Sequence, residues 1–315
     1  MDIEKIIRKN KSEISEISLN MYKSNLLKLN KQINQTDKIK NFDFLKNPSN
    51  VLGLLSNKSD HTKKNYLVSI IVLLKTDETK YKDLIEKYNE LIADIAKKIN
   101  DNYDLNEKSI SQEKNWIEMS DVKDLVKKYK KMYNDVKKKK QLNNNDLQII
   151  QDYLLISLYS GIYFPPVRND FSDLEVILEN EKIDDNKNYL IIKENNSLEF
   201  LFNNYKTKKK YGSYKLPIKS KILSDLILDW NDMNGSEYLL INVKTKKGYN
   251  SNAITKNLNR IYKKEFNKTV STSLLRSIYI SNKLKENLST KDKKTLAKDM
   301  LHSKEMQEEI YNKID

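Results

Sequence analysis

The chain has 315 residues, of which 38% are hydrophobic and 32% charged, and it carries a formal net charge of +14. This length allows two domains that each bury a core. The sequence contains no cysteine and two histidines, His61 and His302, so disulfides and thiolate metal sites are excluded and a histidine-built metal site is not expected.

The positive charge indicates a polyanionic partner, most often nucleic acid. A composition rich in Lys and Asn is also typical of chains encoded by AT-rich genomes, so the charge does not decide the question alone. The first residues, MDIEKIIRKN, contain no long apolar run, and no stretch approaches the roughly 20 apolar residues of a membrane span. We therefore expect an intracellular protein that is not secreted and has no membrane partner.

Residues 1–105 are predicted to form a helical domain. Apolar residues recur at helical spacing along this region, and the clearest stripe consists of Leu84, Tyr88, Leu91, Ile95 and Ile99. Such stripes are typical of core packing. Residues 106–115 are polar and weakly periodic, which favours a linker.

Residues 116–315 are predicted to form a second, α+β domain. Two helical segments come first, and the second of them stops at Gly161. Strand-sized apolar runs follow at residues 174–178, 189–192 and 198–202. The segment 212–218 is expected to pair with the third run across a turn, which gives a small antiparallel sheet, and 238–241 is a candidate for one more strand. Helices resume after Pro217, so the fold class is α+β and mainly helical.

Five groups with related chemistry follow one another along the second domain: Arg168, Lys206, Arg276, His302 and Tyr311. Opening a phosphodiester requires a nucleophile, cations that hold the non-bridging oxygens, and proton transfer to the leaving oxygen. Arginine grips phosphate through its planar fork, and lysine is a suitable proton donor. Tyrosine, with an ordinary pKa of ~10, needs cationic surroundings to act as a nucleophile near neutral pH.

The order of these groups resembles the tyrosine recombinase/integrase family, which includes the phage integrases. Arg168 lies in SGIYFPPVRNDFSDLEV, Lys206 in FNNYKTKKKYGSYKLPI and Arg276 in STSLLRSIYIS, while His302 and Tyr311 lie nine residues apart in AKDMLHSKEMQEEIYNKI. The resemblance covers residues 116–315, which would be the catalytic domain. Residues 1–105 match the family's core-binding domain, which clamps DNA, by position alone.

The resemblance implies the following mechanism. Tyr311 attacks a DNA phosphodiester and forms a 3′-phosphotyrosyl link. Arg168 and Arg276 hold the phosphate with the assistance of His302 and Ser273, and Lys206 protonates the leaving 5′ oxygen. A partner strand then reverses the link, and strand exchange passes through a four-way junction in a homotetramer on two sites of double-stranded DNA. No metal, ATP or other cofactor takes part. The expected setting is a virus or another mobile element, in the viral or host compartment where DNA is handled.

The sequence departs from the family pattern at several places. Phe164, Pro165 and Pro166 lie ahead of Arg168, so the turn of the first arginine is longer than usual. Ser273 stands where the family usually has a histidine, and serine is a poor base although it can hydrogen-bond a phosphate oxygen. Lys208, Lys209 and Lys210 compete with Lys206 for the role of proton donor. Two alternatives stay open: an enzyme that relaxes DNA like a type IB topoisomerase, and a DNA-binding protein with a degenerate recombinase site that no longer cuts.

Overall fold

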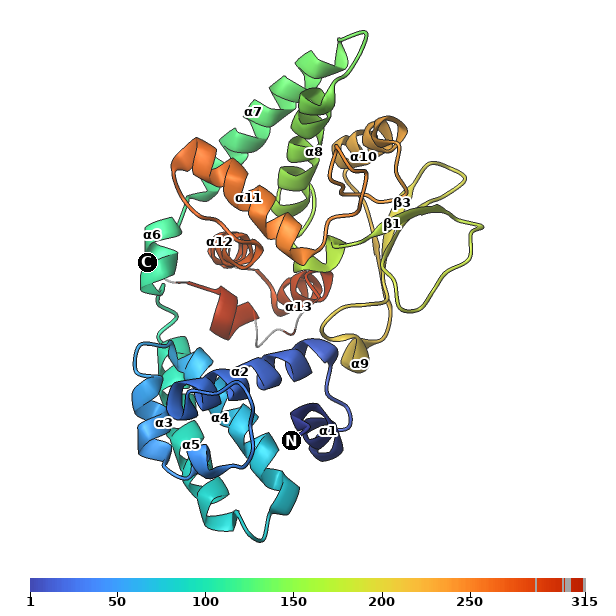
Figure 1. Cartoon of the computed structure of the whole chain (residues 1–315). Coiled ribbons are helices and arrows are strands. Elements are labelled where there is room, and N and C mark those ends of the chain that lie inside the picture. The colour runs from blue at the N-terminus through green and yellow to red at the C-terminus, as the bar shows by residue number, and fades with distance from the viewer. Residues whose placement is uncertain (287, 302, 304–306, 314–315) are drawn as a thin grey trace. The chain divides into compact units, whose positions relative to one another are not determined.

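The computed structural model describes residues 1–286, 288–301, 303 and 307–313. The chain divides into two compact units, Met1–Leu105 (unit 1) and Asn106–Asp315 (unit 2), which Figure 1 shows with their elements labelled. Most of the described residues are helical, and one small sheet lies in unit 2. The prediction of a mainly helical α+β chain is therefore confirmed. None of the helices in the described ranges combines the length and the apolar character that a transmembrane span needs.

Unit 1 is entirely helical in its regular structure. Its elements are α1 (Ile3–Asn10), α2 (Glu16–Asn34), the 3₁₀ turn η1 (Asp43–Leu45), α3 (Pro48–Leu54), α4 (Asp60–Leu74), the 3₁₀ turn η2 (Lys75–Asp77) and α5 (Lys82–Asp104). The most buried of these is α4, whose residues Leu67, Ile70 and Leu73 are fully covered. The hydroxyl of Tyr88 on α5 donates to the Leu45 carbonyl at 2.7 Å and fastens η1 to this core.

Residues 106–115, which the sequence predicts as a linker, contain a short helix and are grouped with unit 2. This helix is α6 (Ile110–Asn115), and it begins with a capping box. The Ser109 hydroxyl accepts from the Gln112 backbone N–H at 3.2 Å, and the Gln112 side chain accepts from the Ser109 N–H at 2.9 Å. A capping box satisfies two of the unpaired N–H groups of the first turn, which explains a helix in so polar a segment.

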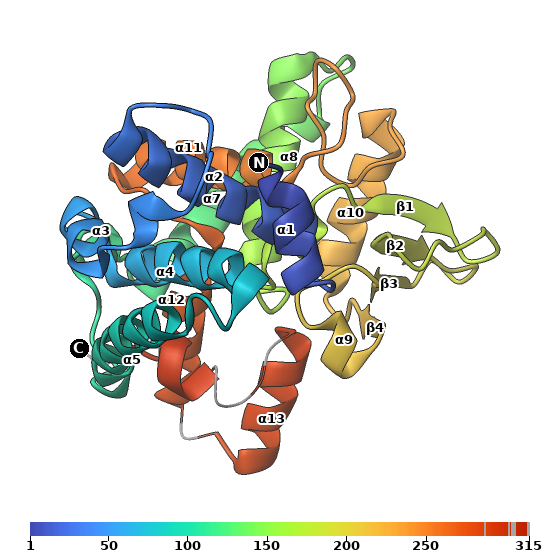
Figure 2. The ribbon, with the colours of Figure 1, turned by 60° about the horizontal axis from the view of Figure 1, so that its bottom comes forward.

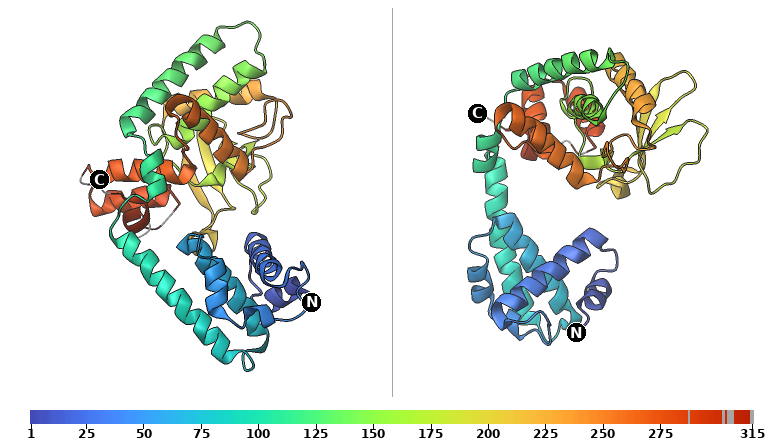
Figure 3. Two further views of the ribbon diagram at one scale, coloured as in Figure 1. Left: turned by 60° about the vertical axis from the view of Figure 1, so that its left-hand side comes forward. Right: turned by 45° about the horizontal axis from the view of Figure 1, so that its top comes forward.

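Unit 2 is built around a helix that is covered on all sides. Its helical elements are α6, α7 (Met119–Lys137), α8 (Asn144–Tyr159), the 3₁₀ turn η3 (Asn169–Phe171), α9 (Lys208–Tyr211), α10 (Lys221–Asn234), α11 (Ser251–Phe266), α12 (Thr272–Leu284), α13 (Thr290–Asp299) and the π-helical turn η4 (Gln307–Tyr311). Figure 3 shows α7 and α8 side by side. Every residue of α8 from Ile150 to Tyr159 is buried, as expected for a helix in the centre of a core.

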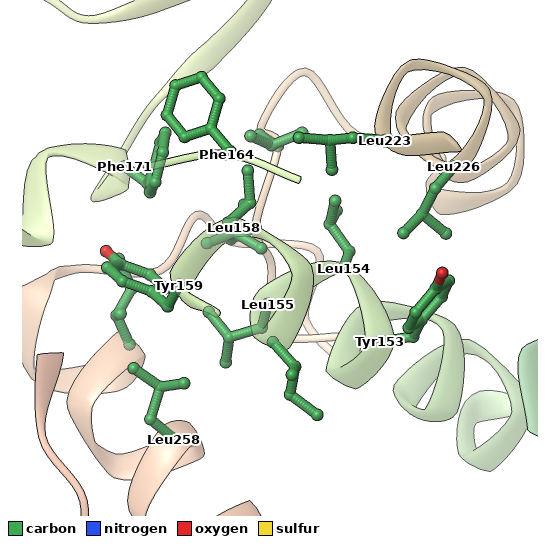
Figure 4. Close-up of a cluster of buried hydrophobic side chains, with 14 of the residues drawn as sticks. Tyr153, Leu154, Leu155, Leu158, Tyr159, Phe164, Phe171, Leu223, Leu226 and Leu258 are labelled. Carbon is green, nitrogen blue, oxygen red and sulfur yellow. The ribbon is translucent and has the colours of Figure 1, made fainter. Parts of the chain in front are cut away.

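Figure 4 shows how the neighbours of α8 surround it. Leu223 and Leu226 come from α10, Leu258 comes from α11, and Phe171 comes from η3. Phe171 also contacts the ring of Phe200 on the sheet, with 5.0 Å between the ring centroids. This core therefore fixes the loop between α8 and η3, which carries Arg168.

The sheet has four strands in the order β1 (Glu175–Leu178), β2 (Tyr189–Ile192), β3 (Leu198–Phe202) and β4 (Tyr214–Pro217). The pairs β2–β3 and β3–β4 are antiparallel, and the expected pairing of the segment after the lysine-rich turn with the third strand is confirmed. The pair β1–β2 is parallel, so the expectation of a purely antiparallel sheet is wrong. The reason is the connection 179–188, which is long enough to carry the chain back before β2 begins.

Two smaller differences concern the edges of the sheet. Residues 238–241 do not form a strand but make isolated bridges, Glu175 with Tyr238 and Ile241 with Gly248. The lysine-rich turn between β3 and β4 contains the single helical turn α9, which lies at the end of this hairpin (Figure 2).

Candidate active site

Arg276 is the buried centre of the candidate site. It lies on α12, which begins where the Ser271 hydroxyl accepts from the Leu274 N–H, and its side chain is 0% exposed. Its Nη1 donates to the carbonyls of Pro166 at 3.1 Å and Met300 at 3.2 Å. Its Nε and Nη2 have no hydrogen-bond partner among the described residues. A buried guanidinium with unused N–H groups is expensive to maintain, which is typical of a site that binds an anion.

Tyr311 lies against this guanidinium. It belongs to η4, which packs on α12, and the distance from Arg276 Cζ to the centroid of the Tyr311 ring is 4.6 Å. Tyr311 is 9% exposed. The stack is a cation–π contact. Burial lowers the pKa of Arg276 because it disfavours the charged form, and the adjacent Tyr311 opposes that shift.

Arg168 reaches the same region from the loop after α8. It is half-buried, and its Nη1 donates to the Leu301 carbonyl at 2.8 Å. Leu301 follows the C-terminal cap of α13, so Arg168 and Arg276 both donate to carbonyls at the end of that helix. The last carbonyls of a helix lack intrahelical partners and carry partial negative charge, which favours cations there.

Leu301 has an unusual backbone conformation. Its φ is +57°, in the left-handed region that leucine rarely adopts. Such a conformation costs about 1–2 kcal/mol, and strain of this kind occurs frequently at functional sites. The left-handed residue ends α13, and the strain is tolerated because Leu301 is buried and its carbonyl accepts two hydrogen bonds.

The second of those bonds comes from the lysine-rich turn. Thr207 Oγ1 donates to the Leu301 carbonyl at 3.4 Å. Within the turn, Lys208 donates to the Asp185 carbonyl, and Lys210 Nζ lies 5.2 Å from the centroid of the Tyr211 ring. Lys206 is exposed and directly precedes Thr207.

Asp170, which the sequence reasoning missed, lies beside both arginines. Burial raises the pKa of this carboxyl to about 6, although the positive charges of Arg168 and Arg276 oppose the shift. Its Oδ2 is buried and has no hydrogen-bond partner in the described part of the chain. The signal in the sequence was a carboxylate two positions after Arg168; the sequence alone did not show that η3 would turn it inward.

The backbone that carries Arg168 is held at two points. The hydroxyl of Tyr159, at the end of α8, donates to the Arg168 carbonyl at 2.9 Å. Gly161 has φ +73°, and a Cβ placed there would lie 2.1 Å from Cδ2 of Tyr279 on α12. A glycine is therefore required where the end of α8 passes the helix that carries Arg276.

The structure thus brings Arg168, Arg276 and Tyr311 together around the end of α13. Ser273 is exposed and lies one turn before Arg276 on α12. In the ranges that the structure describes, no hydrogen bond or ion pair joins the side chain of Lys206 or Ser273 to the side chains of the other three. His302 lies outside the described residues. The donors at this site are cationic, so its chemistry suits an anion; elsewhere in the described ranges, no cluster of three or more His, Cys, Asp or Glu side chains is arranged to hold a metal ion.

Comparison with known proteins adds no relative, because no protein-family model, no curated protein and no solved structure matches this chain.

Proposed function

We propose that this protein is a tyrosine recombinase or integrase, which cuts and rejoins DNA strands through a phosphotyrosyl link at Tyr311. The observation that carries the proposal is the stack of Tyr311 on Arg276, whose Nε and Nη2 have no partner among the described residues. A nucleophile and unused phosphate-binding donors are therefore adjacent, and Arg168 lies beside them. The positive charge of the whole chain, +14, suits a DNA partner.

The reaction conserves the energy of the phosphodiester bond in the phosphotyrosyl link. The Tyr311 oxygen attacks phosphorus and loses its proton, and the bond from phosphorus to the 5′ oxygen breaks. Arg276 and Arg168 stabilise the negative charge that builds on the non-bridging oxygens, because preorganised donors in a buried site do this without reorganisation. The leaving 5′ oxygen takes a proton from a lysine. A 5′-hydroxyl of another strand then attacks the link and frees Tyr311.

We assign the role of that proton donor to Lys206, with Lys209 as the remaining competitor in the turn. Lys208 and Lys210 are already engaged with the Asp185 carbonyl and the Tyr211 ring. Lys206 adjoins Thr207, which contacts the same Leu301 carbonyl as Arg168. His302 directly follows Leu301 in the sequence. We assign it the role of a donor to phosphate, and we assign Ser273 an assisting role.

The residue type at position 273 favours a second candidate, a protein that binds DNA without cutting it. Serine replaces a histidine of the family pattern there, and the proton of Tyr311 must then leave by another route, such as water. The two candidates differ in one property: a cutting enzyme forms a covalent adduct, and a binding protein does not. A type IB topoisomerase reseals the strand that it cut and needs one DNA molecule. A recombinase that acts as a tetramer needs two DNA sites, so the number of DNA sites that the reaction requires separates the two enzymes.

Covalent trapping tests the proposal. The protein is mixed in EDTA with a pool of nicked duplexes whose cleaved fragment diffuses away, and adducts that resist SDS are mapped by mass spectrometry. We expect an adduct at Tyr311 that is absent in Tyr311→Phe. The matched control is Tyr262→Phe, because the Tyr262 hydroxyl is buried on α11 without a partner among the described residues. Salt-sensitive DNA binding with no adduct, also on DNA from the ends of the mobile element, would favour the binding protein.

A further inference from the structure

Ser281 on α12 hydrogen-bonds to the backbone of Tyr311 and of Lys313, the two neighbours of Asn312. The residue is 4% exposed and lies five positions after Arg276 on the same helix. Its Oγ accepts from the Lys313 N–H at 2.7 Å and donates to the Tyr311 carbonyl at 3.4 Å. One hydroxyl thus uses its donor and one acceptor position on the backbone of the tyrosine segment. Serine inside a helix commonly bonds to a carbonyl of its own preceding turn. The Ser281 hydroxyl instead donates to a residue outside α12.

The two hydrogen bonds of Ser281 form a clamp, and Lys313, whose N–H makes one of them, is also anchored through its side chain. Lys313 is 6% exposed, and burial lowers its pKa because the charged form loses solvent. It lines a small cavity of about 30 Å³ together with Trp116, Met119 and Ile278. All of these residues belong to unit 2. Lys313, two positions after Tyr311, therefore packs against other residues of unit 2.

One helix consequently fixes both partners of the catalytic pair. The Arg276 side chain supports the Tyr311 ring, and Ser281 holds the Tyr311 backbone about 7.5 Å further along, at ~1.5 Å of rise per residue. Because both groups are attached to the same helix, the position of Tyr311 relative to Arg276 is fixed. Misplacement of a reacting group by ~1 Å can reduce a rate about 100-fold.

We propose that Ser281 is a positioning residue, which holds the backbone on either side of Asn312 so that Tyr311 stays against Arg276. This inference rests on the proposed function. Ser281 acts through Tyr311 and has no contact with DNA in this proposal. The loss of its hydroxyl should slow the attack and leave the affinity for DNA unchanged.

The first test measures adduct formation with nicked duplex DNA. For Ser281→Ala we expect the rate at saturating DNA to fall about 10- to 100-fold, with an unchanged KM. Ser281→Thr keeps the hydroxyl and should restore the rate to within about threefold. The matched control, Ser277→Ala, removes another buried hydroxyl one turn away on the same helix. Equal losses in Ser281→Ala and Ser277→Ala would overturn the proposal.

The second test needs no catalysis. Hydrogen exchange at the Lys313 amide, measured by mass spectrometry of the C-terminal peptide, should be slow in the wild type and fast in Ser281→Ala. Unchanged protection in the variant would show that the clamp does not exist. If the wild type forms no adduct with DNA but the amide behaves as expected, the proposed function fails and the clamp stands.

Discussion

The guanidinium carbon of Arg276 lies 4.6 Å from the centroid of the Tyr311 ring, in a position where the arginine is fully buried. Such a cation contributes little to stability, because its burial costs solvation that two carbonyl contacts replace incompletely. Arg276 is therefore better explained by the phosphate chemistry that we propose than by packing.

Arg276→Met tests this explanation. Methionine has a similar length and no unpaired N–H groups, so the free energy of unfolding should stay equal or rise. The rate of adduct formation should fall about 10²- to 10³-fold, because donors to the developing negative charge are lost. Urea denaturation and the trapping assay give the two readings.

The matched control for that change is Arg260→Met. Arg260 pairs with the buried carboxylate of Asp152, and its removal takes away the paired cation and leaves the Gln148 hydrogen bond and the charge of Lys264. We expect a loss of about 3 kcal/mol in the free energy of unfolding and no loss of rate for the protein that stays folded. A large destabilisation by Arg276→Met, comparable with the control, would contradict the assignment of Arg276 to catalysis.

Asp170 gives the protein a specific pH dependence. Its pKa in the folded state is about 6, above the ordinary value of 3.8, so the folded state binds more protons between these values than the unfolded state. The free energy of unfolding therefore keeps the contribution of Asp170 below pH 4 and loses it as the pH rises to 6. At about 1.4 kcal/mol per pKa unit, the loss amounts to about 3 kcal/mol.

Asp170→Asn removes this titration. The free energy of unfolding of the variant relative to the wild type should rise by up to about 3 kcal/mol between pH 4 and pH 7. Denaturant unfolding of both proteins at a series of pH values provides the measurement. A difference that does not change with pH would show that Asp170 is not a buried, titrating carboxyl.

Gly161→Ala should damage both the core and the site. The new methyl group would overlap the Tyr279 ring, 2.1 Å from Cδ2, and φ is +73°. We expect a loss of about 2–4 kcal/mol from overpacking and backbone strain, with weaker adduct formation because Gly161 precedes the loop of Arg168. Gly212→Ala is the control, since Gly212 has φ +71° but nothing within 4 Å of the added Cβ. Equal destabilisation by the two changes would mean that contact with Tyr279 does not matter.

The helical character of this chain was predictable because apolar residues repeat at the helical period over long segments, as they do from Leu84 to Ile99. The direction of β1 relative to β2 was not, because apolar runs of four residues carry no information about how the connection 179–188 returns. The helix α6 was missed for a related reason: it depends on the capping pair Ser109 and Gln112, whereas its sequence is polar after Ile110 and has no apolar period.

The candidate site shows the same limit. Arg168, Arg276 and Tyr311 could be chosen from their order along the chain, and their roles stay predictions until adducts are measured. The inward position of Asp170 depends on Phe171, which packs into the core between Tyr159 and Phe200. The strained turn at Leu301 depends on the contacts that α13 makes after folding. Neither has a periodic signal in the sequence.

The role of Lys206 can be tested through the leaving group. If Lys206 protonates the 5′ oxygen, Lys206→Ala should slow adduct formation about 10²- to 10⁴-fold on ordinary DNA. A substrate with sulfur at the 5′ bridging position releases a thiolate, whose conjugate acid has a pKa of ~8.5 and which leaves without a proton. Lys206→Ala should therefore recover most of its rate on the sulfur substrate, whereas Arg168→Ala should stay slow on both.

Lys208→Ala and Lys210→Ala are the matched controls, since both lysines belong to the same turn and already contact other groups. We expect each to retain ordinary DNA cleavage within about threefold, with a small decrease in affinity from the lost positive charge. Rescue by sulfur in Lys208→Ala instead of Lys206→Ala would move the proton donor to Lys208. That result would also require the contact between Lys208 and the Asp185 carbonyl to break when DNA binds.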